Sequence, residues 1–349
     1  MDRPLVSIVV PVYNGEKSIG PCLRAALNQD YPRDKYEIII VDDGSTDNTA
    51  EIVNKAADKV VKHPRNLGLR HARKSGIAAA KGEIIVNMDS DVLIKSDTLT
   101  KIVDYFSKHS SVHAVTGLLS KDHPNTDFFS QYKNLYMNYV FNKLPERVAF
   151  LYGSIHALRK EVARTYGPDY DIGEDTMFGQ ELVSGGKQIA FLKDLEVIHL
   201  KKYTFLSFIK NDFEVPFSWA RIFLKYRGWR QLGKNKTGYA HSPKEQLLSV
   251  ALAPAIILLV LAAMANDSFL YPATAAFVIW FFLNRDFFRY LAKEKGTVFG
   301  MLAIFVTFLD NIIMALGIVC GFCGKRKKEK GDVPQGDTLM RYNSLECNE

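Results

Sequence analysis

The chain has 349 residues, a formal net charge of +7 and a pI of about 9.0. This length is enough for one large domain or two ordinary ones with buried cores, which excludes a small scaffold held by disulfides. The four cysteines are sparse and unevenly spaced, as expected in a reducing compartment. The amino-terminus has no basic segment followed by a long apolar run, so we expect no signal peptide.

Short β-branched runs alternate with helical patterns through the first half of the chain. Residues 6–12 (VSIVVPV) and 37–43 (EIIIVDD) are nearly continuous apolar runs, which predict strands covered on both faces. Between them, apolar residues in 15–30 recur at the spacing of a helix. We then expect a helix over 45–58, a strand over 58–63, a second helix over 70–82 and a further strand over 83–89. Such repeated units predict an α/β fold with a doubly wound, mostly parallel sheet.

Local signals mark the ends of these elements. Ser45 or Asp47 is the expected cap of the helix after the second strand, and Gly82 is the expected end of the next helix. In open sheets of this kind, ligands bind beyond the carboxyl ends of the strands. Two acidic clusters lie at such ends, Asp42 with Asp43 and Asp89 with Asp91.

The segment VNMDSDV places Asp89 and Asp91 one residue apart at a strand end. Two carboxylates this close repel each other unless a cation or hydrogen-bond donors offset the charge. Mg²⁺ or Mn²⁺ would do so, because both ions prefer carboxylate oxygens and leave positions for phosphate oxygens. The alternative is that Asp89 caps a turn and Asp91 is solvated, and a three-residue motif alone does not decide between them.

The composition changes after Lys201. Residues 203–232 mix Phe, Leu, Ile and Trp with Lys and Arg, as helices at a membrane surface do. Three apolar runs follow at 247–265, 269–283 and 298–323, the last interrupted by Asp310 and Asn311. The first run is long enough to cross a bilayer. A buried helix of a soluble protein is the alternative for any single run, but three runs flanked by Lys and Arg favour membrane insertion.

The positive charge lies beside these apolar runs. If the amino-terminal domain is cytoplasmic, two spans return the chain to the basic residues of 285–295 on the same side, as the positive-inside rule requires. A third crossing would place KRKKEK (325–330) outside, so the third run is interfacial or re-entrant, or the rule fails. The distribution suits anionic lipid headgroups better than a nucleic-acid groove, and we expect no nucleic-acid partner.

Four motif-bearing segments together resemble one family. Residues 7–32, 36–53, 65–92 and 171–182 (DIGEDTMFGQEL) resemble, in order and spacing, the family-2 glycosyltransferases, over roughly Pro4 to His199. The resemblance implies a GT-A fold, a nucleotide sugar as donor, a divalent metal (Mg²⁺ or Mn²⁺) and inversion at the anomeric centre. UDP is the donor carrier that it favours.

By resemblance, the donor site takes residues from several motifs. The first nucleotide-contacting loop corresponds to Pro11, Tyr13 and Glu16. The carboxylates that face base and ribose correspond to Asp42 and Asp43, and a basic position near the nucleotide corresponds to Arg73. Asp89 and Asp91 match the DxD motif, with Asp91 as the direct metal ligand and Asp89 nearer the ribose and the metal. A solvated helix face is an equal interpretation of Arg73.

The pair Glu174 and Asp175 matches the family's ED motif, whose Asp takes a proton from the acceptor hydroxyl, so Asp175 is the expected general base. Acids held by the dipole at a helix N-terminus are the structural alternative. His199, Lys201 and Lys202 could bind the donor diphosphate, the metal or an anionic headgroup, with His199 as a candidate metal ligand. A basic strand edge that faces lipid headgroups is the alternative.

The region after the ED pair contains Trp219, Trp229 and Arg230 but lacks the QxxRW motif of processive polysaccharide synthases. We therefore expect a membrane-bound, non-processive enzyme that moves one sugar to a hydroxyl of a membrane lipid or lipid-linked saccharide. A polyprenyl phosphate, which is already anionic and hardly needs a base, is the alternative acceptor. A non-catalytic membrane scaffold with a degenerate transferase domain is a further alternative.

These expectations divide the chain into four regions. They are a cytosolic GT-A domain (1–202), amphipathic membrane-interface helices (203–244), a transmembrane region of two or three helices (245–324) and a basic, disordered tail (325–349). We expect a multi-pass protein of the bacterial inner membrane with its catalytic domain in the cytoplasm. The sequence leaves the sugar, the acceptor and the oligomeric state open.

Overall fold

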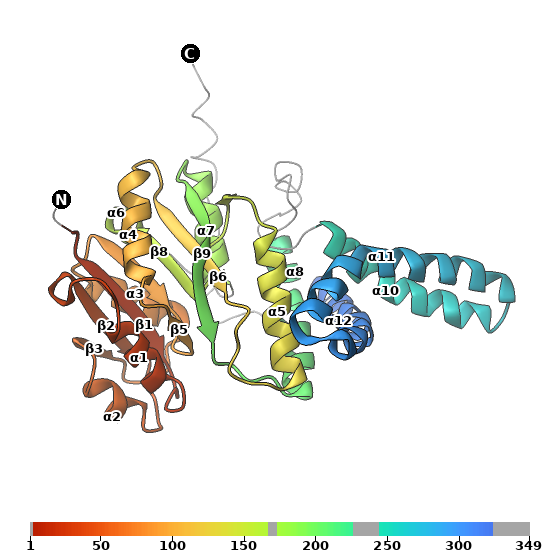
Figure 1. Ribbon diagram of the computed structural model, residues 1–349, viewed down its shortest axis with the longest axis horizontal. Helices are drawn as coiled ribbons and strands as arrows, with labels where there is room; N and C mark the ends of the chain where they lie inside the picture. The colour runs from red at the N-terminus through yellow and green to blue at the C-terminus, as the bar shows by residue number, and fades with distance from the viewer. Residues whose placement is uncertain (1–2, 167–172, 226–243, 324–349) are drawn as a thin grey trace, which may run out of the picture.

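Nine strands form a single sheet within residues 3–166, 173–225 and 244–323, which the computed structural model describes (Figure 1). The strands are β1 (Val6–Val12), β2 (Tyr36–Asp42), β3 (Lys59–Lys62), β4 (Ile84–Met88), β5 (Val92–Ile94), β6 (Ala114–Leu119), β7 (Arg147–Val148), β8 (Ile155–Arg159) and β9 (Ile189–His199). Their order is β3-β2-β1-β4-β8-β6-β9-β5, and β7 pairs with β9. The first four strands are parallel, whereas β8 runs antiparallel to β4 and β6, so the sheet is mixed.

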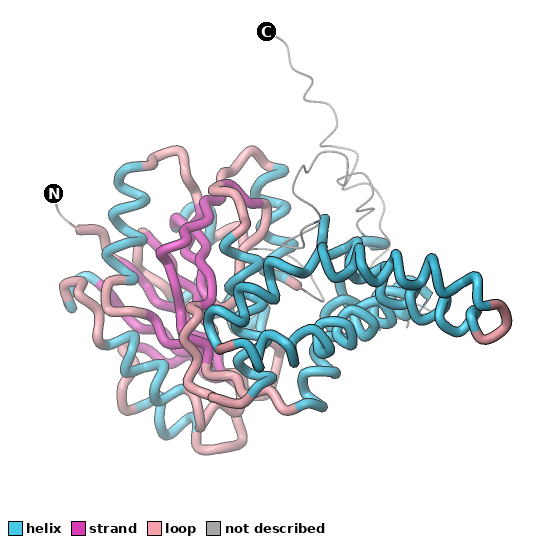
Figure 2. The backbone as a smooth tube through the Cα atoms, turned by 45° about the vertical axis from the view of Figure 1, so that its right-hand side comes forward, coloured by secondary structure: helices cyan, strands magenta, loops and turns pink. Residues whose placement is uncertain are grey.

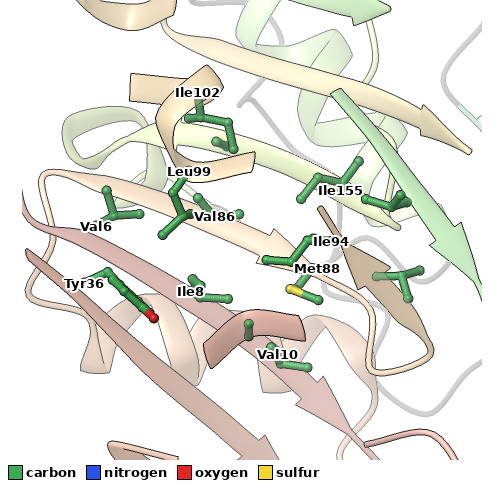
Figure 3. Close-up of a cluster of buried hydrophobic side chains, with 14 of the residues drawn as sticks. Val6, Ile8, Val10, Tyr36, Val86, Met88, Ile94, Leu99, Ile102 and Ile155 are labelled. Carbon is green, nitrogen blue, oxygen red and sulfur yellow. The ribbon is translucent and has the colours of Figure 1, made fainter. Parts of the chain in front are cut away.

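Helices cover both faces of this sheet, as predicted. One face carries α1 (Ile19–Leu27), α2 (Thr49–Asn54) and α4 (Thr98–Lys108), and the other carries α3 (Leu69–Ala79), α6 (Lys160–Ala163) and α7 (Glu174–Ser184). In the first layer, Val6, Ile8 and Val10 of β1 belong to the same buried cluster as Leu99 and Ile102 of α4 (Figure 3). Side chains alternate across a strand, so the remaining residues of β1 pack against the second layer. The continuous apolar run of β1 is therefore buried on both sides.

Two predicted helix ends are wrong. Asn48 occupies the N-cap position of α2 but its side chain makes no capping bond, whereas Asp47, one residue earlier, accepts bonds from the backbone and side chain of Thr49, and Ser45 accepts one from the backbone of Asn14. Helix α3 ends at Ala79, three residues before Gly82. A Cβ atom at Gly82 would lie 2.5 Å from the backbone nitrogen of Ser7, so this glycine serves the close approach of β1 and does not end the helix.

Five further helices build the other half of the molecule. They are α5 (Phe128–Asn142), which packs beside β6, and α8 (Phe205–Lys225), α10 (Lys244–Ala263), α11 (Leu270–Lys295) and α12 (Thr297–Cys323). The hairpin of α10 and α11 extends away from the sheet (Figures 1 and 2). One apolar cluster joins all five helices and includes Tyr132, Leu135, Phe208, Ile256, Trp280, Phe287 and Ala303. Helix α5 therefore belongs to the packing of both halves.

Two helices, α10 and α12, are long and apolar enough to cross a membrane by length and composition. Only 22% and 33% of their apolar windows are buried, whereas the core helix of a soluble protein would be mostly buried. The predicted run 269–283 forms the first part of α11 but does not qualify, since Arg285 and Asp286 follow it. The expected basic tail (325–349), Trp229 and Arg230 lie outside the described residues.

Helix α12 approaches α8 closely through two glycines. Cβ atoms at Gly317 and Gly321 would lie 2.4 Å from the carbonyl oxygen of Phe213 and 2.5 Å from that of Phe217. Small residues four positions apart let helix backbones approach in this way. The contact fixes α12 along α8, beside the sheet half of the molecule.

Candidate active site

The carboxyl ends of β1 and β2 carry the predicted nucleotide-contacting residues. Pro11 is buried within β1, Tyr13 is 47% exposed beyond its end, and Glu16 accepts hydrogen bonds from the backbone and side chain of Asn48. Asp42 ends β2, and its Oδ1 accepts a hydrogen bond from the backbone of Ser45. Its Oδ2 is buried without a partner among the described residues. A buried acceptor without a partner is unfavourable, so a ligand that brought a donor group to this oxygen would stabilise it.

Asp43 differs from Asp42 because both of its oxygens are already used. Oδ1 lies 2.6 Å from Nδ1 of His63 and accepts a bond from the backbone of Leu67, while Oδ2 accepts one from the backbone of Gly68. The other ring nitrogen of His63 lies 2.9 Å from Oγ of Ser75. Asp43 therefore anchors the loop before α3, and its expected place facing the base or ribose stays a prediction.

The DxD carboxylates follow β4 and have different partners. Oδ1 of Asp89 accepts a hydrogen bond from Nη2 of Arg73 at 2.8 Å. Asp91 lies 3.6 Å from Nε2 of His199, because β5 and β9 pair with Val92 opposite His199. Burial raises the pKa of Asp91, with His199 opposing the shift and the charge of Asp89 adding to it. The charge of Asp89 thus acts on the pKa of Asp91 in the direction that the sequence predicts.

Burial also lowers the pKa of His199, although Asp91 and then Asp89 oppose this shift. A neutral imidazole beside two carboxylates is a common partner of a divalent ion. The sheet thus brings the three predicted metal ligands to one place. No group of three His, Cys, Asp or Glu side chains in the described part of the chain is arranged to hold a metal by itself.

Arg73 is buried and links the two acidic motifs, so it is not part of a solvated helix face. Its Nη1 donates to Oε1 of Glu174 at 2.5 Å, and its Nη2 donates to Asp89 and to the carbonyl oxygen of Gly153. Burial disfavours the charged guanidinium, but Glu174 and Asp89 together raise the pKa of Arg73 above its ordinary value. The side chain is therefore a buried cation between two motifs that lie far apart in the sequence.

Glu174 and Asp175 begin α7, where Gly173 adopts the left-handed conformation with φ of 63°. Burial and then the charge of Glu174 raise the pKa of Asp175 to about 6, while Arg73 opposes the shift. A carboxyl group with this pKa is ionised at neutral pH and is a stronger base than an ordinary aspartate. Glu174 forms the ion pair with Arg73, so Asp175 is the carboxylate of the two that remains available for chemistry.

Gly153, which carries no sequence motif, lies where the two acidic motifs meet. A Cβ atom there would lie 2.9 Å from Oδ2 of Asp175, 3.1 Å from Nη2 of Arg73 and 3.6 Å from Oδ2 of Asp89. These distances also place the three side chains around one point. Nothing in the sequence LYGSIHA identified this glycine, because it depends on contacts with residues 64 or more positions before it and on α7 after it.

A cavity of about 820 Å³ opens beside this point, between the sheet half and the helices α8, α10 and α12. Asp175 and His199 line it, together with Lys201, which lies 4.8 Å from the ring of Tyr203 as a cation over an aromatic face. Lys202 is exposed and is not on the cavity wall. His123 and Lys133, which sequence reasoning missed, also line the cavity. The structure therefore separates two lysines that are adjacent in the sequence.

Comparisons with known proteins agree with this architecture. Residues 7–167 match the family described as Glycosyl transferase family 2. An uncharacterized glycosyltransferase of Haemophilus influenzae is 38% identical over 117 residues, which is 32% of this chain and 46% of that protein. Poly(ribitol-phosphate) beta-glucosyltransferase of Bacillus spizizenii is 32% identical over 207 residues, 56% of this chain and 32% of that protein. The chain thus spans less than half the length of these two relatives.

One solved structure resembles nearly the whole chain. Mannosyltransferase PcManGT from Pyrobaculum calidifontis, solved in complex with GDP-Man and Mn²⁺, has a TM-score of 0.57 at 20% identity and covers 93% of this chain and 89% of its own. At this identity the likeness concerns the fold, and its extent includes the long helices. The part of the chain that contains the DxD motif is therefore a glycosyl transferase family 2 domain with a GT-A fold.

Proposed function

We propose that the protein is a membrane-bound, inverting glycosyltransferase. It moves one sugar from a nucleotide sugar, with UDP as the first carrier to test, to a hydroxyl of a membrane lipid or lipid-linked saccharide. The observation that carries this proposal is the position of Asp175, a buried carboxylate with a pKa of about 6 between the DxD residues and an apolar cavity. A base in this place can take the proton of an acceptor hydroxyl as the new bond forms.

The donor would bind at the carboxyl ends of β1, β2 and β4. Asp42 has a free buried oxygen for a donor group of the base, and Tyr13 offers an exposed ring next to it. A divalent ion, Mg²⁺ or Mn²⁺, would be held by Asp91 with Asp89 and His199 and would neutralise the diphosphate. Within the described residues, side chains alone do not form a group of three metal ligands, so phosphate oxygens of the donor would have to share the coordination of such an ion.

Two of the compared proteins support the choice of substrates. The mannosyltransferase was solved with a nucleotide sugar and Mn²⁺, and the relative from Bacillus spizizenii is named for transfer of glucose to poly(ribitol phosphate). Membrane attachment is supported by the exposed apolar surfaces of α10 and α12. With these helices in a membrane, the cavity, and hence Asp175, would lie next to the lipid.

A panel of UDP-sugars and GDP-sugars tests this function. Purified full-length protein is incubated with each donor, a membrane lipid extract and Mn²⁺ or Mg²⁺, with and without a chelator. We expect release of the nucleoside diphosphate from one donor and a lipid product that gains one sugar in mass spectra, both lost with the chelator. Absence of nucleotide binding across the panel would instead support the non-catalytic scaffold.

A polyprenyl phosphate is the second candidate acceptor, and Lys201 on the cavity wall favours it. Such an acceptor is anionic and needs little help from a base. The two acceptors are distinguished by Asp175→Asn, which would nearly abolish transfer to a hydroxyl but leave much of the transfer to a phosphate.

A further inference from the structure

We propose that the cavity beside Asp175 holds the whole acceptor as one amphiphilic molecule. Its hydroxyl-bearing headgroup would lie against α5, and its apolar chain would lie between α8, α10 and α12. The inference rests on the proposed glycosyl transfer and adds the place and chemical class of the acceptor. The hydrocarbon chain is then bound by the protein and not left in the surrounding lipid.

The wall of the cavity contains both polar and apolar side chains. Its apolar side chains include Val215 and Ile222 of α8, Val250 of α10, and Met314 and Ile318 of α12. The volume of about 820 Å³ is in the range of roughly 300–1,000 Å³ found for ligand pockets. Helices α10 and α12 are also the two candidate spans, so the apolar part of the cavity begins where the molecule would meet lipid.

Two amide side chains on the wall have oxygens that are buried without a partner among the described residues. The side-chain nitrogen of Asn134 donates to the carbonyl oxygen of Ser120, and its Oδ1 has no partner among the described residues. Oε1 of Gln246 is likewise buried without a partner there. Both residues line the cavity. Both oxygens are shielded from the open space, so rotation of the amide side chains would bring them to the hydroxyls of a sugar or glycerol headgroup, which donate hydrogen bonds readily.

The buried lysine on the same wall does not favour an anionic headgroup. Nζ of Lys133 is hydrogen-bonded to Oδ1 of Asp212, and both residues line the cavity. Oδ1 of Asp212 also accepts a hydrogen bond from the side-chain nitrogen of Asn211. The charge of Lys133 is therefore already offset inside the protein, and a phosphate would have to compete with Asp212 for it. A neutral headgroup fits this wall without breaking the ion pair.

Photo-crosslinking tests the proposal without a donor. The probes are a hexadecyl β-glucoside that carries a diazirine in its chain and a hexadecyl phosphate with the same chain. Full-length protein in detergent is labelled with each, and the modified residues are mapped by mass spectrometry. We expect adducts of the glucoside at Met314, Ile318 and Val250, and weaker labelling of these positions by the phosphate.

Two neighbouring residues of α12 provide a matched pair of variants. Ile318→Trp fills the cavity, whereas Val319→Trp adds the same bulk on the outer face, where Val319 is 56% exposed. We expect roughly tenfold weaker labelling in the cavity for I318W and unchanged labelling for V319W. Met314→Trp, one turn away, repeats the test if I318W folds poorly.

Asn134→Leu should weaken labelling by the glucoside by about threefold to tenfold and leave labelling by the phosphate unchanged.

Several outcomes would overturn the proposal. They are adducts confined to the outer face at Leu316 and Val319, equal losses in I318W and V319W, or stronger labelling of the cavity by the phosphate. Donor turnover is followed in the same preparations. Lost turnover with intact labelling would contradict the proposed function alone, and intact turnover without cavity labelling would contradict this inference alone.

Discussion

The charge of a single residue, Arg73, connects the donor side of the site with the acceptor side. It donates to Asp89 of the DxD motif and to Glu174 of the ED motif, and it is only 1% exposed. Removal of one partner from a buried ion pair leaves an uncompensated charge and is strongly destabilising. The arrangement therefore ties the orientation of α7, which carries Asp175, to the strand end that carries Asp89.

The pKa of Asp175 sets an expected pH dependence. Transfer to a hydroxyl acceptor needs the ionised form, so kcat/KM should rise as the pH increases through about 6 and level off above 7. The same raised pKa makes the folded protein less stable as the pH increases. The folded protein binds the proton of Asp175 more tightly than the unfolded chain, so the contribution of this group to stability falls as the pH rises from 3.8 towards 6. A pH profile of kcat/KM that is flat between 5 and 8 would contradict the role of Asp175.

Arg73→Lys should shift the pH profile of kcat/KM. The lysine keeps a positive charge but cannot donate to Asp89 and Glu174 in the fixed geometry of a guanidinium. Because Arg73 opposes the upward shift of the Asp175 pKa, a weaker partner should move the acidic limb to higher pH and lower the thermal midpoint. Lys74→Arg, at the exposed neighbouring position, serves as the control and should leave both unchanged. An unshifted limb in R73K would argue against the electrostatic link.

Gly153→Ala should reduce activity more than stability. The new methyl group would lie 2.9 Å from Oδ2 of Asp175, so the carboxylate must move, and displacements of about 1 Å can cost roughly 100-fold in rate. The control is Gly185→Ala at the other end of α7, where a Cβ atom meets only ordinary contacts at 3.5 Å. We expect a large fall in kcat for G153A alone, with thermal midpoints of both variants close to wild type. Equal kcat values in the two variants would rule out this packing role.

The sequence predicts those helices and strands whose formation depends on residues close together in the chain. Strands β1, β2 and β4 are continuous β-branched runs, and no helical pattern competes with them. The mixed half of the sheet is different, because the pairing of β8 with β4 and of β9 with β5 depends on contacts far apart in the chain. The motifs located the Asp89, Asp91 and Asp175 carboxylates, but the partners of Arg73 and Asp43 and the position of Gly153 required the packed structure.

The glycine contact between α8 and α12 leads to a prediction about these elements. Gly317→Val would force the new side chain against the carbonyl oxygen of Phe213, which lies 2.4 Å from a Cβ atom at that position. Overpacking of this kind costs about 1–3 kcal/mol, so the thermal midpoint in detergent should fall. Leu316→Val on the exposed face is the control and should change little. An unchanged midpoint in G317V would mean that the two helices do not pack this closely.

In the whole molecule, the carboxylate of Asp175 lies between the sheet half and the long apolar helices. The sheet half supplies the donor residues, while α8, α10 and α12 supply an apolar wall, and Asp175 lies where the two meet. The predicted charge pattern around the apolar runs pointed to a membrane, but it could not show that the helices enclose a cavity with the sheet domain. That feature depends on α5, which packs with both halves.

The most direct test of the account is the rate of sugar transfer to a lipid hydroxyl by Asp175→Asn compared with wild type. The account predicts a loss of about 100-fold to 10,000-fold, the range of a missing general base, with unchanged donor binding and an unchanged thermal midpoint. Transfer by D175N at a rate close to that of the wild type would contradict it.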